Sequence, residues 1–390
     1  MEEKNLTLKN LRLVNYRNYT DSKLEFSPNL NILWGDNAQG KSNLLEAIYY
    51  LGHGRSYRLV PDDQVLQWDR HSFVIQASFF QDTIQSLLEI SFSKDPRKKN
   101  INFNGTPLPR LEKLGRIFPV VLFSPDDLQL VKGSPNYRRN YLDTLLSKIY
   151  PDYAEANYRY QRVLIQRNHL LKLPDNVSNR NLLETLDQEI SKHGAYILAY
   201  RLSFLPSLGR YLRKYFSEIA QADAELNMLY SSSLTSSQLV LETINSLNDT
   251  KLCVQRILNS MIINFTNALA KLRSVDRLKG TTTIGPQRDD LVFRIQGKNL
   301  RQFGSQGQQR SMVLALRLSE LELMDQSLAN RPILLLDDVF SELDEKRCFA
   351  LLRMLKLERQ VFITTTSIEN LPEELTNKAA FYQVKSGFIK

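Results

Sequence analysis

A short glycine-containing segment near residue 40 has the residue types needed to hold a nucleoside triphosphate. The phosphate-loop pattern G-x-x-x-x-G-K-[ST] is matched at every fixed position by Gly35-Asp36-Asn37-Ala38-Gln39-Gly40-Lys41-Ser42. In such a loop, backbone N–H groups surround the β and γ phosphates, and the N-terminus of the following helix adds a positive field. We predict that Lys41 bridges these phosphates as a catalytic charge and that the Ser42 hydroxyl ligates Mg²⁺. The whole loop is therefore predicted to bind ATP.

A phosphate loop needs an acidic partner at the end of a neighbouring strand, and residues 333–338 supply one. An apolar run typical of a buried parallel strand is followed by two carboxylates in Ile333-Leu334-Leu335-Leu336-Asp337-Asp338. We predict that Asp337 holds Mg²⁺, directly or through water, and that Asp338 is the catalytic group that polarises the attacking water. The alternative is an ordinary aspartate pair at a helix N-terminus.

Composition excludes several classes of protein. The chain has 390 residues, of which 42% are hydrophobic and 24% charged, so wholesale disorder, fibrous repeats and small disulfide scaffolds are excluded. Its apolar runs are strand-sized and no secretory signal is expected, so we predict a cytoplasmic protein with no membrane association. Two cysteines without metal or redox spacing fit a reducing compartment. A formal net charge of +9 favours a polyanionic partner, or merely a soluble basic surface.

The order of the predicted elements indicates an α/β domain with an insertion. Alternating apolar residues predict three strands between residues 6 and 34, and a helix follows the phosphate loop. Turn signals at residues 93–96 and at Asn104-Gly105 predict an antiparallel subsheet. Glycine is scarce from residue 137 to 279, where amphipathic stretches at 153–173 and 182–215 predict helices punctuated by Pro174 and Pro206.

Strand and helix signals alternate again from residue 280, with a strand at 332–336, a helix at 341–357 and a strand at 360–364. We therefore predict a discontinuous head domain, residues 1–130 and 280–390, and an inserted helical lobe, residues 131–279. The proline interruptions disfavour a long rod-like coiled coil in the inserted lobe.

Segments spread over the whole chain occur in an order shared with a known ATPase family. Besides the phosphate loop, they are Leu13–Tyr19, Asn43–Ile48, Phe123–Leu128, Lys132–Pro135, Arg138–Asp143, Gly285–Leu291, Phe303–Arg310 and Asp337–Asp344. In this order the chain resembles the ATP-binding-cassette (ABC) ATPases of the SMC type, and most closely the RecF family. The resemblance implies an α/β fold, an ABC-type P-loop ATPase head (SMC-like) with an antiparallel β subdomain and an inserted α-helical lobe.

Residues 305–309 resemble the signature motif of this family. The segment Ser305-Gln306-Gly307-Gln308-Gln309 precedes a predicted helix, 310–324, whose N-terminus would be a second phosphate-binding site. The resemblance implies that this motif contacts ATP held by a partner subunit, with Ser305 catalytic in trans, so that ATP binding assembles a twofold homodimer. From the residues alone, a polar loop with a helix cap is the alternative.

Further site residues follow from the resemblance. It implies a D-loop containing Ser341 and Asp344, a switch contact from Thr366 and a nucleotide contact from Arg17, for which an ordinary surface arginine is an equal alternative. No Q-loop glutamine is evident near residues 124–127. Transporters of this superfamily usually carry glutamate at the position of Asp338, so we expect slow hydrolysis from the shorter side chain.

The function implied by the resemblance is ATP-dependent DNA binding in recombinational repair and replication restart. ATP would clamp two copies onto double-stranded DNA near single-strand gaps, and with RecO and RecR the protein would help to load RecA. Basic clusters are candidate DNA contacts, each with a solvated surface as its alternative: Arg97, Lys98, Lys99, Arg138 and Arg139.

Two other functions stay open at this stage. The chain could be the nucleotide-binding subunit of a membrane transporter, which the basic balance and glutamine-rich signature disfavour. It could also be a short SMC-type protein that bridges DNA structurally, which the proline-interrupted insert disfavours.

Overall fold

The chain divides into two compact units. The computed structural model describes residues 5–220, 225–234, 250–342, 345–354, 359–371, 373–376 and 379–389. The first unit comprises Met1–Leu128, Glu218–Gln221 and Ser311–Lys390, and the second comprises Gln129–Ser217 and Ala222–Arg310. The second boundary differs from the one expected from sequence, since residues 280–310 belong to the second unit.

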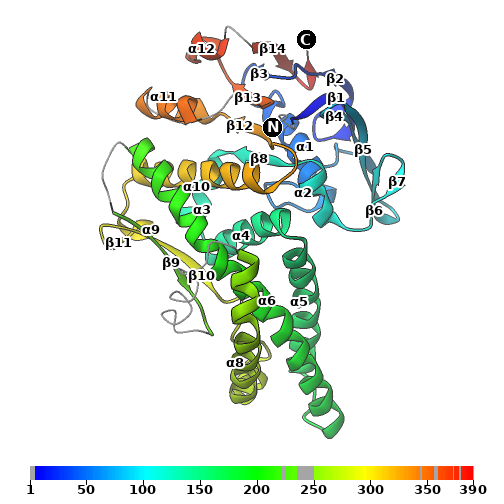
Figure 1. Ribbon diagram of the computed structural model, residues 1–390. Helices are drawn as coiled ribbons and strands as arrows, with labels where there is room; N and C mark the ends of the chain where they lie inside the picture. The colour runs from blue at the N-terminus through cyan, green and yellow to red at the C-terminus, as the bar shows by residue number, and fades with distance from the viewer. Residues whose placement is uncertain are drawn as a thin grey trace. The chain divides into compact units, whose positions relative to one another are not determined.

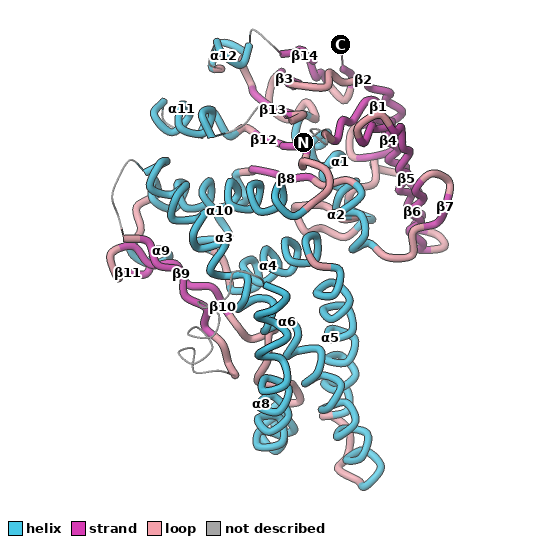
Figure 2. Tube along the Cα trace, in the orientation of Figure 1, coloured by secondary structure: helices cyan, strands magenta, loops and turns pink. Residues whose placement is uncertain are grey.

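An antiparallel sheet forms one part of the first unit. Its strands follow the order β2-β1-β4-β5-β6-β7, with bounds β1 Leu6–Tyr16, β2 Tyr19–Glu25, β4 Ser72–Gln81, β5 Ile84–Lys94, β6 Arg97–Phe103 and β7 Thr106–Pro107. The predicted turns are confirmed, because Lys94 pairs with Arg97 across one and Phe103 with Thr106 across the other. Figure 2 shows these strands as a continuous magenta sheet.

A second, mainly parallel sheet carries the candidate chemistry. Its order is β15-β14-β3-β13-β12-β8, with bounds β3 Leu30–Trp34, β8 Val120–Phe123, β12 Ile333–Asp337, β13 Val361–Thr365, β14 Ala379–Lys385 and β15 Phe388–Ile389. Strand β13 lies between β3 and β12, parallel to both. The end of β13 is therefore placed between the phosphate loop and the acidic pair.

Helix α1, Lys41–His53, packs between the two sheets of the first unit (Figure 1). Leu44, Leu45 and Ile48 belong to one buried cluster with Phe73 of β4 and Leu335 of β12. Burial of such side chains stabilises the fold by about 1.5–3 kcal/mol each. The core thus fixes the start of α1, and with it the phosphate loop.

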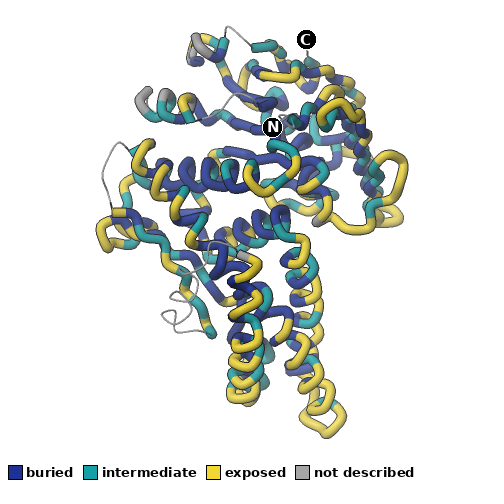
Figure 3. The backbone as a smooth tube through the Cα atoms, in the orientation of Figure 1, coloured by how far each residue is buried: buried dark blue, intermediate teal, exposed yellow. Residues whose placement is uncertain are grey.

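Three long helices dominate the second unit: α5 Pro151–Leu170, α6 Val177–Ala220, which runs on into the first unit, and α8 Thr250–Lys279. Their outward faces are largely exposed and their facing sides buried (Figure 3). Pro206 lies inside α6, so the prediction that it interrupts the helix is wrong. Leu205 and Leu208 are buried on either side of it. Their packing stabilises the helix although Pro206 lacks the backbone N–H that would donate to the preceding turn.

A small sheet in the order β11-β10-β9 completes the second unit. Its strands are β9 Leu226–Ser231, β10 Asp290–Ile295 and β11 Lys298–Asn299. Pairing of β10 with β9 explains why residues 280–310 join this unit. The remaining α-helices are α2 Leu114–Ile117, α3 Gln129–Lys132, α4 Pro135–Ile149, α9 Leu300–Phe303, α10 Gln306–Ser327, which crosses the unit boundary, α11 Glu345–Met354 and α12 Glu373–Thr376.

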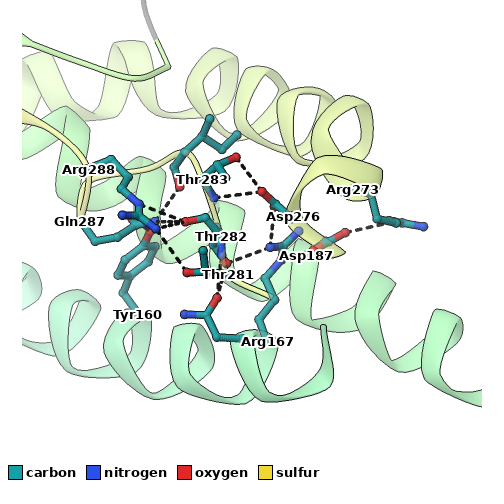
Figure 4. Close-up of polar contacts among 12 residues, drawn as sticks. Tyr160, Arg167, Asp187, Arg273, Asp276, Thr281, Thr282, Thr283, Gln287 and Arg288 are labelled. Atoms are coloured by element: carbon teal, nitrogen blue, oxygen red, sulfur yellow. Dashed lines mark hydrogen bonds and ion pairs between the residues drawn. The ribbon is translucent and has the colours of Figure 1, made fainter. Parts of the chain in front are cut away.

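Arg167 of α5 links the three long helices through a buried ion-pair cluster (Figure 4). Its Nε donates to Asp187 Oδ1 of α6 at 2.7 Å, and its Nη1 donates to Asp276 Oδ2 of α8 at 2.8 Å. Asp276 also accepts from the backbone N–H of Thr283 at 2.9 Å. All three charged side chains are at most 5% exposed. Arg167 compensates both carboxylates, and Asp187 also pairs with Arg273 of α8 at 3.0 Å.

Replacing this arginine should therefore destabilise the second unit. Arg167→Met leaves buried Asp276 without its cation and leaves Asp187 only its pair with Arg273 at 3.0 Å, so we expect the free energy of unfolding in urea to fall by about 3 kcal/mol. Arg180→Ala is the control, since it removes an exposed pair with Asp175 and should change stability little. Equal stability of Arg167→Met and the wild type would contradict the role assigned to the cluster.

Candidate nucleotide and metal site

The phosphate loop adopts a backbone that its two fixed glycines make possible. Gly35 has φ 146° and Gly40 has φ 116°, values that side-chain-bearing residues rarely adopt. A Cβ on Gly40 would lie 2.5 Å from Asn18 Nδ2, and one on Gly35 would lie 2.4 Å from the Val384 carbonyl oxygen. Both positions therefore require glycine for conformation and for space.

Residues far away in sequence hold this loop in place. Asn18 Nδ2 donates to the Gln39 carbonyl at 3.0 Å, and the Tyr19 hydroxyl donates to the Gly40 carbonyl at 3.0 Å. From the other side, the backbone N–H of Ser386 donates to Gln39 Oε1 at 2.7 Å. These contacts preorganise the loop. Sequence reasoning missed them, because nothing local links residue 18 or 386 to residue 39.

The start of α1 offers donors and a positive charge for phosphate. Gly40 is the N-cap and makes no side-chain cap bond, so the first N–H groups of α1 face outward as an anion site. Lys41 Nζ donates to the carbonyls of Gly35 and Asp36 at 2.6 and 2.7 Å. Burial lowers the pKa of Lys41, and the nearby carboxylates, Asp338 foremost, partly oppose this. A bound triphosphate would favour the charged ammonium further.

Ser42 and Asp337 meet as the sequence predicts. The Ser42 hydroxyl donates to Asp337 Oδ1 at 2.8 Å. Two residues that sequence reasoning missed orient this carboxylate: the Tyr57 hydroxyl donates to Oδ2 at 3.0 Å and the Thr364 hydroxyl to Oδ1 at 2.8 Å. Burial and the Asp337 charge raise the pKa of Tyr57, so its hydroxyl stays protonated and donates.

Asp338 lies beside this carboxylate in an unusual backbone conformation. Its φ is 50°, in the left-handed region that is uncommon for residues other than glycine. The conformation is held by its own N–H, which donates to Thr364 Oγ1 at 2.9 Å. The carboxylate is half-buried, and Asp338 is the strongest of the nearby charges acting on Lys41. The predicted water-polarising group is thus adjacent to the predicted phosphate-binding charge.

The donor set fits magnesium. Ser42 Oγ and the Asp337 carboxylate are hard oxygen ligands at one point, and Mg²⁺ in nucleotide sites takes one or two carboxylates together with phosphate oxygens. Within the described ranges, no group of three or more His, Cys, Asp or Glu could hold a metal on its own. Ser42 and Asp337 are therefore the residues that would hold Mg²⁺ with the triphosphate.

Other predicted nucleotide contacts gain less support. Arg17 donates from Nε and Nη2 to the Glu46 carboxylate at 2.8 Å each, so its guanidinium orders α1, and a nucleotide contact stays a prediction. Thr366 is exposed directly after β13, whereas Thr364 is the residue that touches the acidic pair. Of the predicted D-loop, Asp344 lies outside the described residues and Ser341 belongs to a short 3-10 helix, Val339–Glu342.

The signature segment forms a capped helix start in the second unit. The backbone N–H of Gln308 donates to Ser305 Oγ at 3.2 Å, and the backbone N–H of Ser305 donates to Gln308 Oε1 at 3.0 Å. This is a reciprocal capping box, and the helix begins at Gln306, four residues earlier than predicted. Ser305 and Gln306 are exposed, Gly307 and Gln308 are half-buried, and buried Gln309 donates to the Leu300 carbonyl.

The predicted DNA-contact residues differ in availability. Arg97 is 64% exposed and Lys98 is exposed, but Lys99 donates to the Gly54 carbonyl and pairs with Asp62 at 2.6 Å. Arg138 is 5% exposed and forms a two-bond pair with Asp290 at 2.8 and 2.9 Å. This buried pair does not favour a DNA contact by Arg138, which stays an untested prediction. Neighbouring Arg139 is half-buried.

Comparison with known proteins decides the family. Residues 7–390 match the family described as RecF/RecN/SMC N terminal domain. The chain is 38% identical over 382 residues to the DNA replication and repair protein RecF of Streptococcus agalactiae, covering 98% of this chain and 97% of the relative. It is 37% identical over 379 residues to RecF of Bacillus cytotoxicus, covering 97% of both chains. The chain belongs to the RecF family.

Solved structures agree with RecF membership. The fold matches a structure described as the recombination mediator protein RecF-ATP in the RecFOR pathway, with a TM-score of 0.86 and 30% identity over 100% of this chain and 98% of that one. An Smc head domain from Pyrococcus furiosus shares the fold alone, with a TM-score of 0.53 and 14% identity over 99% of this chain and 95% of that one. The predicted SMC-like ABC ATPase fold is confirmed. Among the helices described here, none has the length and apolarity needed to cross a bilayer.

Removing the loop lysine should abolish nucleotide binding. Lys41→Ala deletes a charge-assisted contact to phosphate, so we expect ATP affinity to fall by at least about 100-fold in equilibrium titration. Lys23→Ala, an exposed lysine on β2, is the control and should bind normally. Near-native ATP affinity of Lys41→Ala would remove the phosphate-loop assignment.

The hydroxyl at residue 364 should affect hydrolysis more than binding. Thr364→Val keeps the strand shape but removes the contacts to Asp337 and to the Asp338 N–H, so we expect kcat for ATP to fall by about 10- to 100-fold with little change in ATP affinity. Thr365→Val is the matched control, because that hydroxyl donates to the Ser367 carbonyl instead. Equal rates for the two variants would refute the role of Thr364.

Proposed function

We propose that this chain is an ATP-controlled DNA-binding protein of recombinational repair. The observation that carries the ATP assignment is the bond between Ser42 and Asp337, which joins the phosphate loop to its acidic partner. The DNA assignment is supported by the relatives, which are named DNA replication and repair protein RecF, and by the net charge of +9. A RecF structure with ATP supports ATP as the ligand.

The chemistry proposed is hydrolysis of ATP by direct water attack on the γ phosphorus. Asp338 accepts a hydrogen bond from the water and orients it in line with the bond to the β-phosphate oxygen, which breaks to give ADP and phosphate. Lys41 and the N–H groups of α1 stabilise the charge on the phosphate oxygens. Mg²⁺, held by Ser42 and Asp337, would neutralise the charge on the β and γ phosphates. The short Asp338 side chain supports slow turnover.

The second half of the site is proposed to come from another copy. The Ser305 hydroxyl is exposed at the start of a 22-residue helix, where a phosphate would meet backbone donors and the positive helix end. We propose that Ser305 of one copy contacts the γ phosphate bound at Lys41 of the other. ATP then assembles an isologous dimer, and hydrolysis releases it.

The dimer is proposed to clamp double-stranded DNA near single-strand gaps, where it would act with RecO and RecR to load RecA. Exposed Arg97 and Lys98 on the β5–β6 hairpin, together with half-buried Arg139, remain the candidate contacts to phosphate. Sequence-independent binding is expected, since such contacts read the backbone and not the bases.

Blocking the signature serine should separate ATP binding from assembly. Ser305→Arg places a bulky cation where the γ phosphate of the partner's nucleotide would lie, so we expect normal ATP affinity but a monomer mass in sedimentation with ATP. Ser260→Arg, on the exposed face of α8, is the control and should dimerise like the wild type. A normal ATP-induced dimer of Ser305→Arg would refute the shared site.

A further inference from the structure

A polar pocket in the second unit has no role in the ATP chemistry. It has a volume of about 300 Å³ and is lined by α4, α5, α6 and the segment around Pro286 and Gln287. Its lining includes residues of two segments that carry the family resemblance, Arg138–Asp143 and Gly285–Leu291. Neither segment contributes to the phosphate loop. The volume is at the lower end of the range for small-molecule sites, about 300–1,000 Å³, and suits a ligand no larger than one nucleotide.

Arg139 and Arg201 line this pocket, Arg138 lies next to Arg139 in the chain, and the three differ in their ion pairs. Arg138 pairs with Asp290, and Arg201 pairs with Asp143 at 2.6 Å. Arg139 forms no ion pair with the described residues and instead donates to the Asp289 carbonyl at 2.7 Å and to Asn136. Burial, and then the charge of Arg201, lower the pKa of Arg139, and the charges of Asp290, Asp143 and Asp289 partly oppose this. Asp143 also lines the pocket, but Asp143 and Asp290 are already paired with Arg201 and Arg138. Arg139, which has no ion pair of its own among the described residues, is the guanidinium left to pair with an anion.

The pocket also presents unused hydrogen-bonding groups. Asn140, Asn157 and Gln161 line it, and their carboxamides make no hydrogen bond to the described part of the chain. Each carboxamide has a donor and an acceptor side by side in one plane. The edges of nucleobases carry the complementary pairs, which is why asparagine and glutamine recognise bases through two bonds.

One wall of the pocket is rigid. Tyr160 is fully buried and its hydroxyl donates to Gln287 Oε1, while Gln287 Nε2 donates to the Ile284 carbonyl at 2.7 Å. Gly285 permits this arrangement, because a Cβ there would lie 2.5 Å from the Tyr160 hydroxyl. This wall of the pocket, formed by Tyr160 and Gln287, is therefore fixed before any ligand arrives, which lowers the entropic cost of binding against it.

We propose that this pocket binds one nucleotide, with its phosphate against Arg139 and its base against the carboxamides of Asn140, Asn157 and Gln161. The nucleotide is either free in solution or one unit of a single DNA strand. This site lies wholly within the second unit and is independent of the phosphate loop, so the proposed ATP function stands whether or not the pocket is occupied.

Calorimetric titration of the full-length chain tests the proposal. Lys41→Ala is introduced throughout, so that no nucleotide binds at the phosphate loop. The probes are thymidine 5′-monophosphate, thymidine, inorganic phosphate and a four-residue thymidine oligonucleotide. We expect the monophosphate to bind at one site per chain and at least about 10-fold more tightly than thymidine or phosphate alone, because only it engages both parts of the pocket.

Two substitutions locate the binding. Gln161→Glu places a carboxylate in the pocket with almost no change of shape and should weaken the monophosphate by at least about 10-fold. Arg139→Ala should do the same, with thermal unfolding measured to show that the variant is folded. Gln166→Glu, an exposed residue on the same helix, is the matched control and should bind like the parent.

The arms of the experiment separate the outcomes. If the oligonucleotide loses more affinity than the monophosphate on Gln161→Glu, the ligand is a unit of a DNA strand; equal losses identify a free nucleotide. Monophosphate binding that Gln161→Glu leaves unchanged would overturn the proposal. So would an absence of monophosphate binding, or displacement of the monophosphate by a tetraglutamate peptide at lower concentration.

Discussion

The hydrogen bond between Ser42 and Asp337 joins segments 295 residues apart in the chain, and the proposed ATP chemistry depends on it. Neither residue could hold Mg²⁺ alone. A hydroxyl is a weak ligand, and a single carboxylate does not fix the position of the metal relative to the phosphates. Their meeting requires β3 and β12 to lie on either side of β13, with α1 anchored in the core between the sheets. The architecture of the first unit is thus the means by which one hydroxyl and one carboxylate converge.

In the second unit, buried ion pairs hold polar groups in place. Arg167, fully buried, ties α5 to α6 and α8 through two carboxylates. Arg201 does the same for α6, α4 and the segment at Pro286, to whose carbonyl it donates at 2.9 Å. Buried charges are costly unless paired. Arg138 and Arg201 are paired with Asp290 and Asp143, whereas Arg139 has no ion pair of its own among the described residues, so it is the guanidinium at the pocket most suited to a ligand.

Sequence reasoning succeeded where the chemistry is local. The phosphate loop, the strand that ends in Asp337-Asp338 and the alternation of strands and helices follow from spacing within a few residues, and the partnership of Ser42 with Asp337 follows from the chemistry that a phosphate loop requires. It failed where partners come from afar: Thr364, Tyr57 and Asn18 contact the site only through tertiary packing. Arg138 and Arg139 are adjacent and identical in type, yet one is buried in an ion pair and the other faces a pocket, which no sequence pattern distinguishes.

Each chain is proposed to hold half of a hydrolytic site, with Lys41 and Asp338 in one copy and Ser305 from another. The most direct measurement is the rate of ATP hydrolysis per chain as a function of protein concentration, at saturating ATP and Mg²⁺. Shared sites require the rate per chain to rise with concentration at high dilution and then to level off as dimers saturate. A rate per chain that is constant down to the lowest concentration, where sedimentation shows only monomers, would contradict the account.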